Sequence, residues 1–152
     1  MRPTTTSPAL EPAPALEPAA CNCLAIRQAA RQITQIYDRH LAAEGLRTSQ
    51  YSILARLSRL GPLPINELAA LMVMDRTTMG RAVRPLEREK LVAIGPGVDG
   101  RTRVVRLTAA GEQRIKAAGA RWREAQREFE IAYGVEDAAK LRAALARVVS
   151  IG

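Results

Sequence analysis

The strongest candidate for binding chemistry is a row of basic side chains on one face of a predicted helix. Apolar residues recur at steps of four and three within residues 76–89, which predicts a helix whose apolar face holds Met79, Val83 and Leu86. At about 100° per residue, a second set of side chains lies about 140° to 200° away from Met79. This set comprises Thr77, Arg81, Arg84 and Arg88. Guanidinium groups at this spacing suit a helix in the major groove of DNA, with Arg81 as the predicted base reader.

The start of this helix is also suited to contact DNA. Asp75 is a good capping residue, and Arg76, Thr77 and Thr78 follow it. Hydroxyl groups, free backbone N–H groups and the positive end of the helix dipole favour phosphate or base-edge contacts there. An arginine-rich face can also be an ordinary solvated surface, so the distribution of charge is informative. Of the net charge of +8, a share of +6 lies within residues 46–108, which favours a polyanionic partner for this block.

Two predicted strands, residues 92–94 and 103–107, follow the helix and form a hairpin. Their loop contains the pattern G-x-G-x-x-G at residues 95–100, which also occurs in dinucleotide-binding sites. That site requires a helix directly after the glycines, whereas a strand follows here, so a nucleotide site is not expected. Arg101 and Arg103 flank the tip and are placed to reach a minor groove, whose narrow A·T tracts attract arginine.

The elements that must position these residues are predicted to be mainly helical. Helices are expected at residues 24–41, 49–60 with Thr48 as N-cap, 64–71, 76–89, 108–132 and 137–150. The pair 64–71 and 76–89, joined by a tight turn, is the helix-turn-helix pattern. Pro85 lies inside the second of these helices, where it removes one N–H group, so a kink or an early end is expected there.

Length and composition exclude several classes of protein. The 152 residues suit one domain, expected at residues 21–152, whereas the Pro/Ala-rich residues 1–20 are predicted to be a disordered tail. No run of 18 apolar residues exists, and prolines interrupt any signal-peptide core, so we expect a cytoplasmic protein without membrane contact. One histidine without a nucleophile motif builds no catalytic triad, so no enzyme activity is expected.

Cys21 and Cys23 lie one residue apart, just before the first predicted helix. This spacing does not fit a disulfide-rich secreted fold, so both thiols are expected to be reduced in the cell. Together with His40 they supply too few ligands for a closed zinc site, and neither a metal nor another cofactor is predicted. Two interpretations remain open: packing as small apolar residues at a dimer interface, or oxidation of a thiolate favoured by the helix dipole.

These motifs resemble the MarR (multiple antibiotic resistance regulator) family of winged helix-turn-helix transcription factors. The resemblance spans residues 21–150, with matching motifs at 46–54, 68–69 and 75–91, and its most specific part is D-x-R at 99–101 followed by L-T-x-x-G at 107–111. It implies a mainly α fold with a small β-hairpin wing. It also implies a homodimer in which segments 21–45 and 109–152 flank a DNA-binding lobe at 46–108. Arg101 would enter the minor groove, positioned by Asp99. Lys90 stands where the family often has a glycine, which forms a left-handed cap at the helix end.

The function implied by this resemblance is regulation of transcription in a bacterial or archaeal cell, at the nucleoid. The homodimer would bind a pseudo-palindromic operator in double-stranded DNA and repress transcription until a small aromatic or phenolic effector releases it. The side chains predicted to line the effector pocket are Tyr37, His40, Arg47 and Tyr51. Two alternatives stay open: a redox-sensing regulator that uses Cys21 and Cys23, and a helical dimeric interaction module whose basic face binds an acidic protein.

Overall fold

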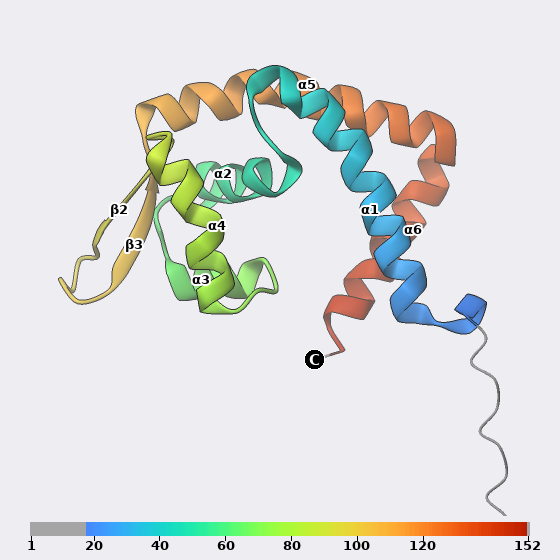
Figure 1. Ribbon diagram of the computed structural model, residues 1–152, viewed down its shortest axis with the longest axis horizontal. Helices are drawn as coiled ribbons and strands as arrows, with labels where there is room; N and C mark the ends of the chain where they lie inside the picture. The colour runs from blue at the N-terminus through green and yellow to red at the C-terminus, as the bar shows by residue number, and fades with distance from the viewer. Residues whose placement is uncertain (1–17, 152) are drawn as a thin grey trace, which may run out of the picture.

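The computed structural model describes residues 18–151, which form six α-helices and a small antiparallel sheet (Figure 1). The helices are α1 (Asn22–Leu41), α2 (Thr48–Leu60), α3 (Ile65–Leu71), α4 (Arg76–Arg88), α5 (Ala109–Tyr133) and α6 (Val135–Val149). The strands are β1 (Leu63–Pro64), β2 (Val92–Pro96) and β3 (Arg103–Leu107), and the 3-10 helices are η1 (Pro18–Ala20) and η2 (Ala42–Glu44). The predicted mainly α fold with a β-hairpin wing is confirmed.

The predicted tail, residues 1–20, lies outside the described residues except for its last three. Those three residues form the 3-10 helix η1. The amide of Cys21 donates to the carbonyl of Pro18 at 3.2 Å, which links this turn to the start of α1. Within residues 18–151, no helix combines the length and the apolarity needed to cross a membrane.

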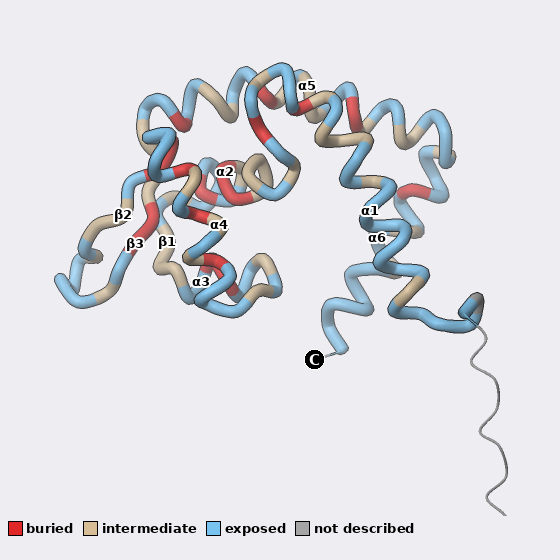
Figure 2. Tube along the Cα trace, viewed as in Figure 1, coloured by how far each residue is buried: buried red, intermediate tan, exposed pale blue. Residues whose placement is uncertain are grey.

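The core lies mainly within one lobe built from α2, α3, α4 and the sheet. Figure 2 shows that buried segments gather in this lobe and at intervals along α5, whereas α1 and α6 are largely exposed. The apolar face predicted for α4 is the buried one, because Met79, Val83 and Leu86 are fully inaccessible to solvent. They pack with Leu54 and Leu68 in a single cluster, which fixes the opposite face of α4 toward solvent.

The sheet has the order β1-β3-β2, and both neighbouring pairs are antiparallel. The wing hairpin pairs Val92 with Leu107 and Ile94 with Val105. The sequence interpretation missed β1, whose two residues are too short to show a period, and it began the following helix one residue early. Pro64 of β1 pairs with Val104 of β3, and α3 begins at Ile65.

Side-chain caps explain where several helices begin. Asp75 Oδ1 accepts from the Thr78 amide at 2.8 Å, so this predicted cap is confirmed. Thr108 Oγ1 accepts from the Gly111 amide at 3.0 Å, so Thr108 is the N-cap of α5 and not its predicted first residue. The prediction for Thr48 is wrong, because this residue is the first residue of α2. Its amide and its hydroxyl instead donate to Asp38 Oδ1 on α1, at 2.7 and 2.6 Å. Asp38 therefore accepts hydrogen bonds from the first residue of α2 although it lies outside that helix.

Two expectations concern the end of α4: an early end at Pro85 and a left-handed cap at Lys90. An early end at Pro85 is wrong, since α4 continues to Arg88 and the Pro85 carbonyl still accepts from the Glu89 amide at 3.0 Å. Proline lacks only its own N–H group, so the next turn forms normally. Lys90 adopts a φ of 59°, which confirms the left-handed cap.

Helix α5 connects the lobe to the other helices and runs along the length of the molecule (Figure 1). Its first turn lies so close to Leu91, the residue before β2, that a Cβ atom on Gly111 would be 2.0 Å from the Leu91 carbonyl oxygen. Farther along, α5 packs against α1 and then turns through Gly134, at a φ of 99°, into α6. The predicted start of the last helix at residue 137 is two residues late, because this single glycine suffices for the turn.

Candidate nucleic-acid interface

The face of α4 opposite the core carries the side chains that the sequence pattern predicts for DNA contact. Thr77, Arg81, Arg84 and Arg88 are all exposed, as is Arg76 in the first turn. A shallow hollow of about 360 Å³ follows this face and is lined by Ile65, Arg76, Thr77, Gly80, Arg81 and Arg84. The hollow therefore has guanidinium groups along its sides and one apolar side chain from α3.

A second hollow, of about 200 Å³, lies between the start of α4 and the wing. It is lined by Pro64, Ile65, Asn66, Arg76, Arg101, Thr102 and Arg103. Arg76 and Ile65 line both hollows, so the two adjoin and form one cationic surface from the wing to the middle of α4. Three guanidinium groups around so small a space are suited to a phosphate group. Sequence analysis missed Asn66, because α3 was assigned only through its apolar face.

The two threonines at the start of α4 are placed differently. The Thr78 hydroxyl donates to Asp75 Oδ2 at 2.6 Å, so it completes the helix cap, whereas Thr77 lines the α4 hollow. The hydrogen bond from the Thr78 side chain, followed by that from its amide, lowers the pKa of the Asp75 carboxyl group below its ordinary value. The cap is therefore anionic at neutral pH, next to the positive end of the α4 dipole.

Asp99 organises the tip of the wing through the backbone. Its Oδ1 accepts from the amides of Arg101 and Thr102 at 3.0 and 2.9 Å, and its Oδ2 accepts from the Thr102 hydroxyl. The Thr102 hydroxyl, followed by the two amides, lowers the pKa of this carboxyl group. Asp99 thus fixes the chain that carries Arg101 and leaves the Arg101 side chain exposed.

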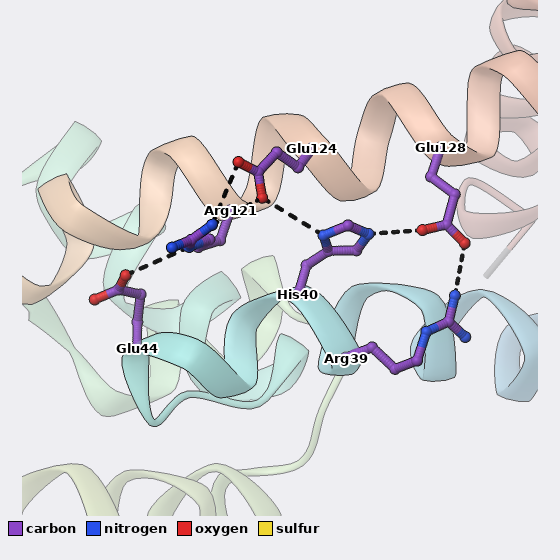
Figure 3. A network of polar contacts seen from close by, with 6 residues as sticks. All are labelled: Arg39, His40, Glu44, Arg121, Glu124 and Glu128. Carbon is purple, nitrogen blue, oxygen red and sulfur yellow. Dashed lines mark hydrogen bonds and ion pairs between the residues drawn. The ribbon is translucent and has the colours of Figure 1, made fainter.

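The four side chains predicted for an effector pocket have different partners. Tyr37 donates to Gln126 on α5, and His40 Nε2 lies 2.7 Å from Glu128 Oε2. His40 belongs to a network of polar contacts between α1, η2 and α5. The network comprises Arg39, His40, Glu44, Arg121, Glu124 and Glu128 (Figure 3). Arg47 lines a different hollow, and its Nη1 lies 3.7 Å from Asp38 Oδ2. These polar groups join α1 and its following turn to neighbouring elements.

Tyr51 alone among the four lines a hollow with an aromatic wall. Its ring stacks on Trp122, with 6.3 Å between the ring centroids and 10° between the planes. Burial raises the pKa of the Tyr51 phenol, which keeps it neutral. The hollow measures about 420 Å³ and is lined by Tyr51, Ser52, Ala55, Arg56, Arg59, Met72 and Trp122. The sequence pattern does not indicate Trp122, Arg56 and Arg59 as site residues, because only the packing of α2 on α5 brings them together.

Both cysteines are exposed in this chain, at the start of α1. Cys21 is the N-cap residue, and its Sγ accepts from the Leu24 amide at 3.4 Å. Among the residues that the structure describes, no group of three or more His, Cys, Asp or Glu side chains is arranged to hold a metal ion.

A helix-turn-helix followed by a β-hairpin, with a cationic face that spans both, defines a winged helix-turn-helix DNA-binding protein. The MarR family model matches residues 46–93. The transcriptional regulator MosR of M. tuberculosis, solved in complex with DNA, is 35% identical, with a TM-score of 0.78 over 86% of this chain and 94% of that chain. The chain belongs to the MarR family. It is a DNA-binding transcriptional regulator and not an enzyme.

Two further relatives agree with this assignment. A probable transcriptional regulator from Pseudomonas aeruginosa is 28% identical, with a TM-score of 0.79 over 87% of this chain and 99% of that chain. The uncharacterized HTH-type transcriptional regulator YwoH of Bacillus subtilis (strain 168) is 28% identical over 112 residues, which cover 74% of this chain and 82% of that protein.

Proposed function

We propose that this regulator is a homodimeric repressor that reads a pseudo-palindromic operator with α4 and the wing. The observation that carries the proposal is the continuous cationic surface formed by the two adjoining hollows. In this proposal Arg81 reads a base edge in the major groove, and Arg101 enters the minor groove. Further contacts to bases and phosphates come from Arg76, Thr77, Thr78, Arg84, Arg88 and Arg103. Such a protein works at the nucleoid, in the cytoplasm of a bacterial or archaeal cell.

The second copy in this proposal covers the helices outside the DNA-binding lobe. Segments 21–45 and 109–152 expose large apolar side chains, whereas residues 46–108 contain most of the buried core. The most exposed apolar side chains of α1, α5, α6 and the residues after α6 are Ile26, Ile131, Val135, Val149 and Ile151. Burying such surface against an identical chain is favourable at roughly 25 cal/mol per Å² of apolar area. A two-fold dimer also presents two α4 helices to two half-sites of one operator.

The operator proposal is tested by titrating the full chain with two duplexes at several salt concentrations. One duplex is selected by the protein from random-sequence DNA, and the other is its shuffled sequence. Specific operator binding exceeds non-specific binding by roughly 10³-fold or more at physiological salt. Equal affinity for both duplexes would overturn the proposal and favour the alternative, a helical dimer whose basic face binds an acidic protein.

For the signal that releases DNA, we propose a small aromatic acid bound in the hollow beside Tyr51 and Trp122. The stacked rings offer an aromatic wall, and Arg56 and Arg59 supply cations for a carboxylate group. A ligand releases DNA only through its different affinities for the free and DNA-competent conformations, and 100-fold release requires about 2.7 kcal/mol. A few contacts in this hollow are enough for that difference.

Trp122 makes this proposal directly measurable, because it is the one tryptophan of the sequence. Salicylate, benzoate and p-coumarate are the probes, and saturable quenching of Trp122 fluorescence together with weaker operator binding is expected. The double variant Arg56→Ala, Arg59→Ala should lose both effects, whereas Arg127→Ala, an exposed arginine elsewhere on α5, should keep them. Failure of all three acids to quench or to release DNA would exclude this effector class from the hollow.

The exposed cysteines support a second candidate, regulation by a peroxide. A thiolate of the pair attacks the peroxide O–O bond, which gives a sulfenic acid and releases water or an alcohol. The other thiol then attacks the sulfenic sulfur, forms a disulfide and releases water. Cys21 Sγ would give up its hydrogen bond with the Leu24 amide, so the first turn of α1 would rearrange. The expected result is that peroxide releases DNA from wild type but not from the variant Cys21→Ser, Cys23→Ser. Equal release from both would exclude the cysteines.

A further inference from the structure

Gly80 occupies a position in α4 where nothing in the described part of the chain requires a glycine. It lies within a regular helix, and its φ is outside the left-handed region that favours glycine. Apart from its chain neighbours and the backbone of its own helix, a Cβ atom built on Gly80 would meet no heavy atom of residues 18–151 within 4 Å. A glycine in a helix interior costs roughly 1 kcal/mol relative to alanine. The reason for the missing side chain therefore lies outside the free chain.

The surroundings of Gly80 indicate what approaches it. Gly80 is partly buried and lies one helical turn from both Arg76 and Arg84, so it forms a notch between two cations at the edge of the exposed face of α4. Ile65 of α3 lines the same hollow. The backbone amides of a helix interior are occupied by their own hydrogen bonds, so the notch offers carbon atoms and no donor. An apolar group of small size fits there better than a phosphate oxygen.

The dimensions of DNA leave little clearance at this point. A helix with its side chains measures about 10–12 Å across, and the major groove is about 12 Å wide. In that groove, the apolar group that base pairs present is the C5-methyl of thymine. We propose that Gly80 is a specificity-determining residue whose notch receives the C5-methyl group of one thymine in each operator half-site. The inference rests on the proposed operator reading by α4 and adds a residue that has no side chain.

The test exchanges the two methyl groups that would compete for the notch. Gly80→Ala adds a methyl group to the protein, and uracil in place of thymine removes one from the DNA without changing base pairing. The duplex is the one that wild-type protein selects from random DNA, with single thymines replaced in turn at equivalent positions of both half-sites. At one position, wild type should lose about fourfold in affinity per half-site on uracil, the value for one buried methyl group. Gly80→Ala should bind the thymine duplex at least tenfold more weakly and prefer uracil at that position.

A matched control separates this role from helix stability. Gly119 is an interior glycine of α5 whose added Cβ would make only an ordinary contact, 3.6 Å from an Arg123 nitrogen. Gly80→Ala and Gly119→Ala should both raise Tm, because both remove a helix glycine. Only Gly80→Ala should change DNA binding.

The outcomes also separate the inference from the function on which it rests. If wild-type protein binds the selected duplex and its shuffled sequence equally, operator reading itself fails. If wild type prefers the selected duplex but Gly80→Ala shows no position at which the thymine preference reverses, only the notch proposal is overturned. Equal losses of Gly80→Ala on thymine and uracil duplexes would indicate a close approach of the DNA backbone instead.

Discussion

Arg81 and Arg101 are exposed cations on two different elements, so they test two kinds of DNA contact. Removing Arg81 by Arg81→Ala should abolish discrimination at one base pair per half-site, since a bidentate contact to guanine contributes about 1–3 kcal/mol. The variant should remain folded because the side chain lies outside the core. Competition between duplexes that differ at single base pairs measures this effect, with Arg127→Ala as the control. Unchanged specificity would remove Arg81 from the set of base readers.

The wing arginine should contribute in a different way. Arg101→Ala is expected to weaken binding most on operators with A·T-rich flanks, because their narrow minor grooves have the stronger negative potential. Asp99 keeps its hydrogen bonds to the backbone in this variant, so the wing turn should persist. Affinities for operators with A·T-rich and G·C-rich flanks provide the measurement. An equal loss on both would contradict insertion into the minor groove.

Glu128 connects the titration of a single carboxyl group to the stability of the fold. Its pKa is lowered from an ordinary 4.5, first by the hydrogen bond with His40 and further by Arg39, while desolvation opposes the shift (Figure 3). A carboxyl group with a lowered pKa in the folded state stabilises that state above the unfolded pKa, and this contribution is lost as pH falls through the folded value. Stability should therefore decrease below about pH 4.5 more steeply in wild type than in Glu128→Gln. Urea unfolding from pH 3 to 7 measures this, and identical slopes would contradict it.

At the scale of elements, two turns hold residues with side chains in a conformation suited to glycine. Val73, between α3 and α4, has a φ of 53°, and Lys90, after α4, has a φ of 59°. The left-handed conformation costs about 1–2 kcal/mol for a residue with a Cβ atom, and glycine loses about 0.5–1 kcal/mol more through its entropy in the unfolded chain. Val73→Gly and Lys90→Gly should each stabilise the protein by about 0.5–1 kcal/mol in urea unfolding. Lys116→Gly, inside α5, should instead lower the free energy of unfolding. A loss of stability in all three variants would contradict backbone strain at Val73 and Lys90.

The elements that could be predicted are those whose information is local. The spacing of Met79, Val83 and Leu86 is enough to define the buried face of α4 and hence its exposed arginines. Asp75 acts on an amide three residues away, so its cap is also visible in the sequence.

The elements that were missed depend on partners distant in the chain. β1 exists only because β3 pairs with it, and the start of α2 depends on Asp38 in α1. The hollow beside Tyr51 forms through Trp122, 71 residues later, and no periodic pattern indicates that contact. The position of Arg76 between α4 and the wing is likewise a product of tertiary packing.

At the scale of the whole molecule, α6 and the ends of α1 and α5 have more apolar surface than one chain covers. A variant without residues 134–152 should be aggregated or unfolded, since it loses α6 and leaves the apolar end of α5 without a partner. Size-exclusion chromatography with light scattering gives the assembly state. A folded, soluble monomer would contradict the proposed dimer. The milder variant Ile131→Glu, Val149→Glu changes two exposed side chains and should give a folded monomer with weakened operator binding.

The continuity of α5 has a mechanical consequence. Its 25 residues form a rod about 37 Å long, anchored to the lobe by the close contact of Gly111 with Leu91. A tilt of about 5° at the far end of this rod displaces the lobe by about 3 Å, which is close to the rise of one base pair, about 3.4 Å. In the proposed dimer, two such levers change the separation of the two α4 helices by more than one base-pair step. A small rotation where α1 meets α5 is then enough to move both α4 helices out of register with their half-sites.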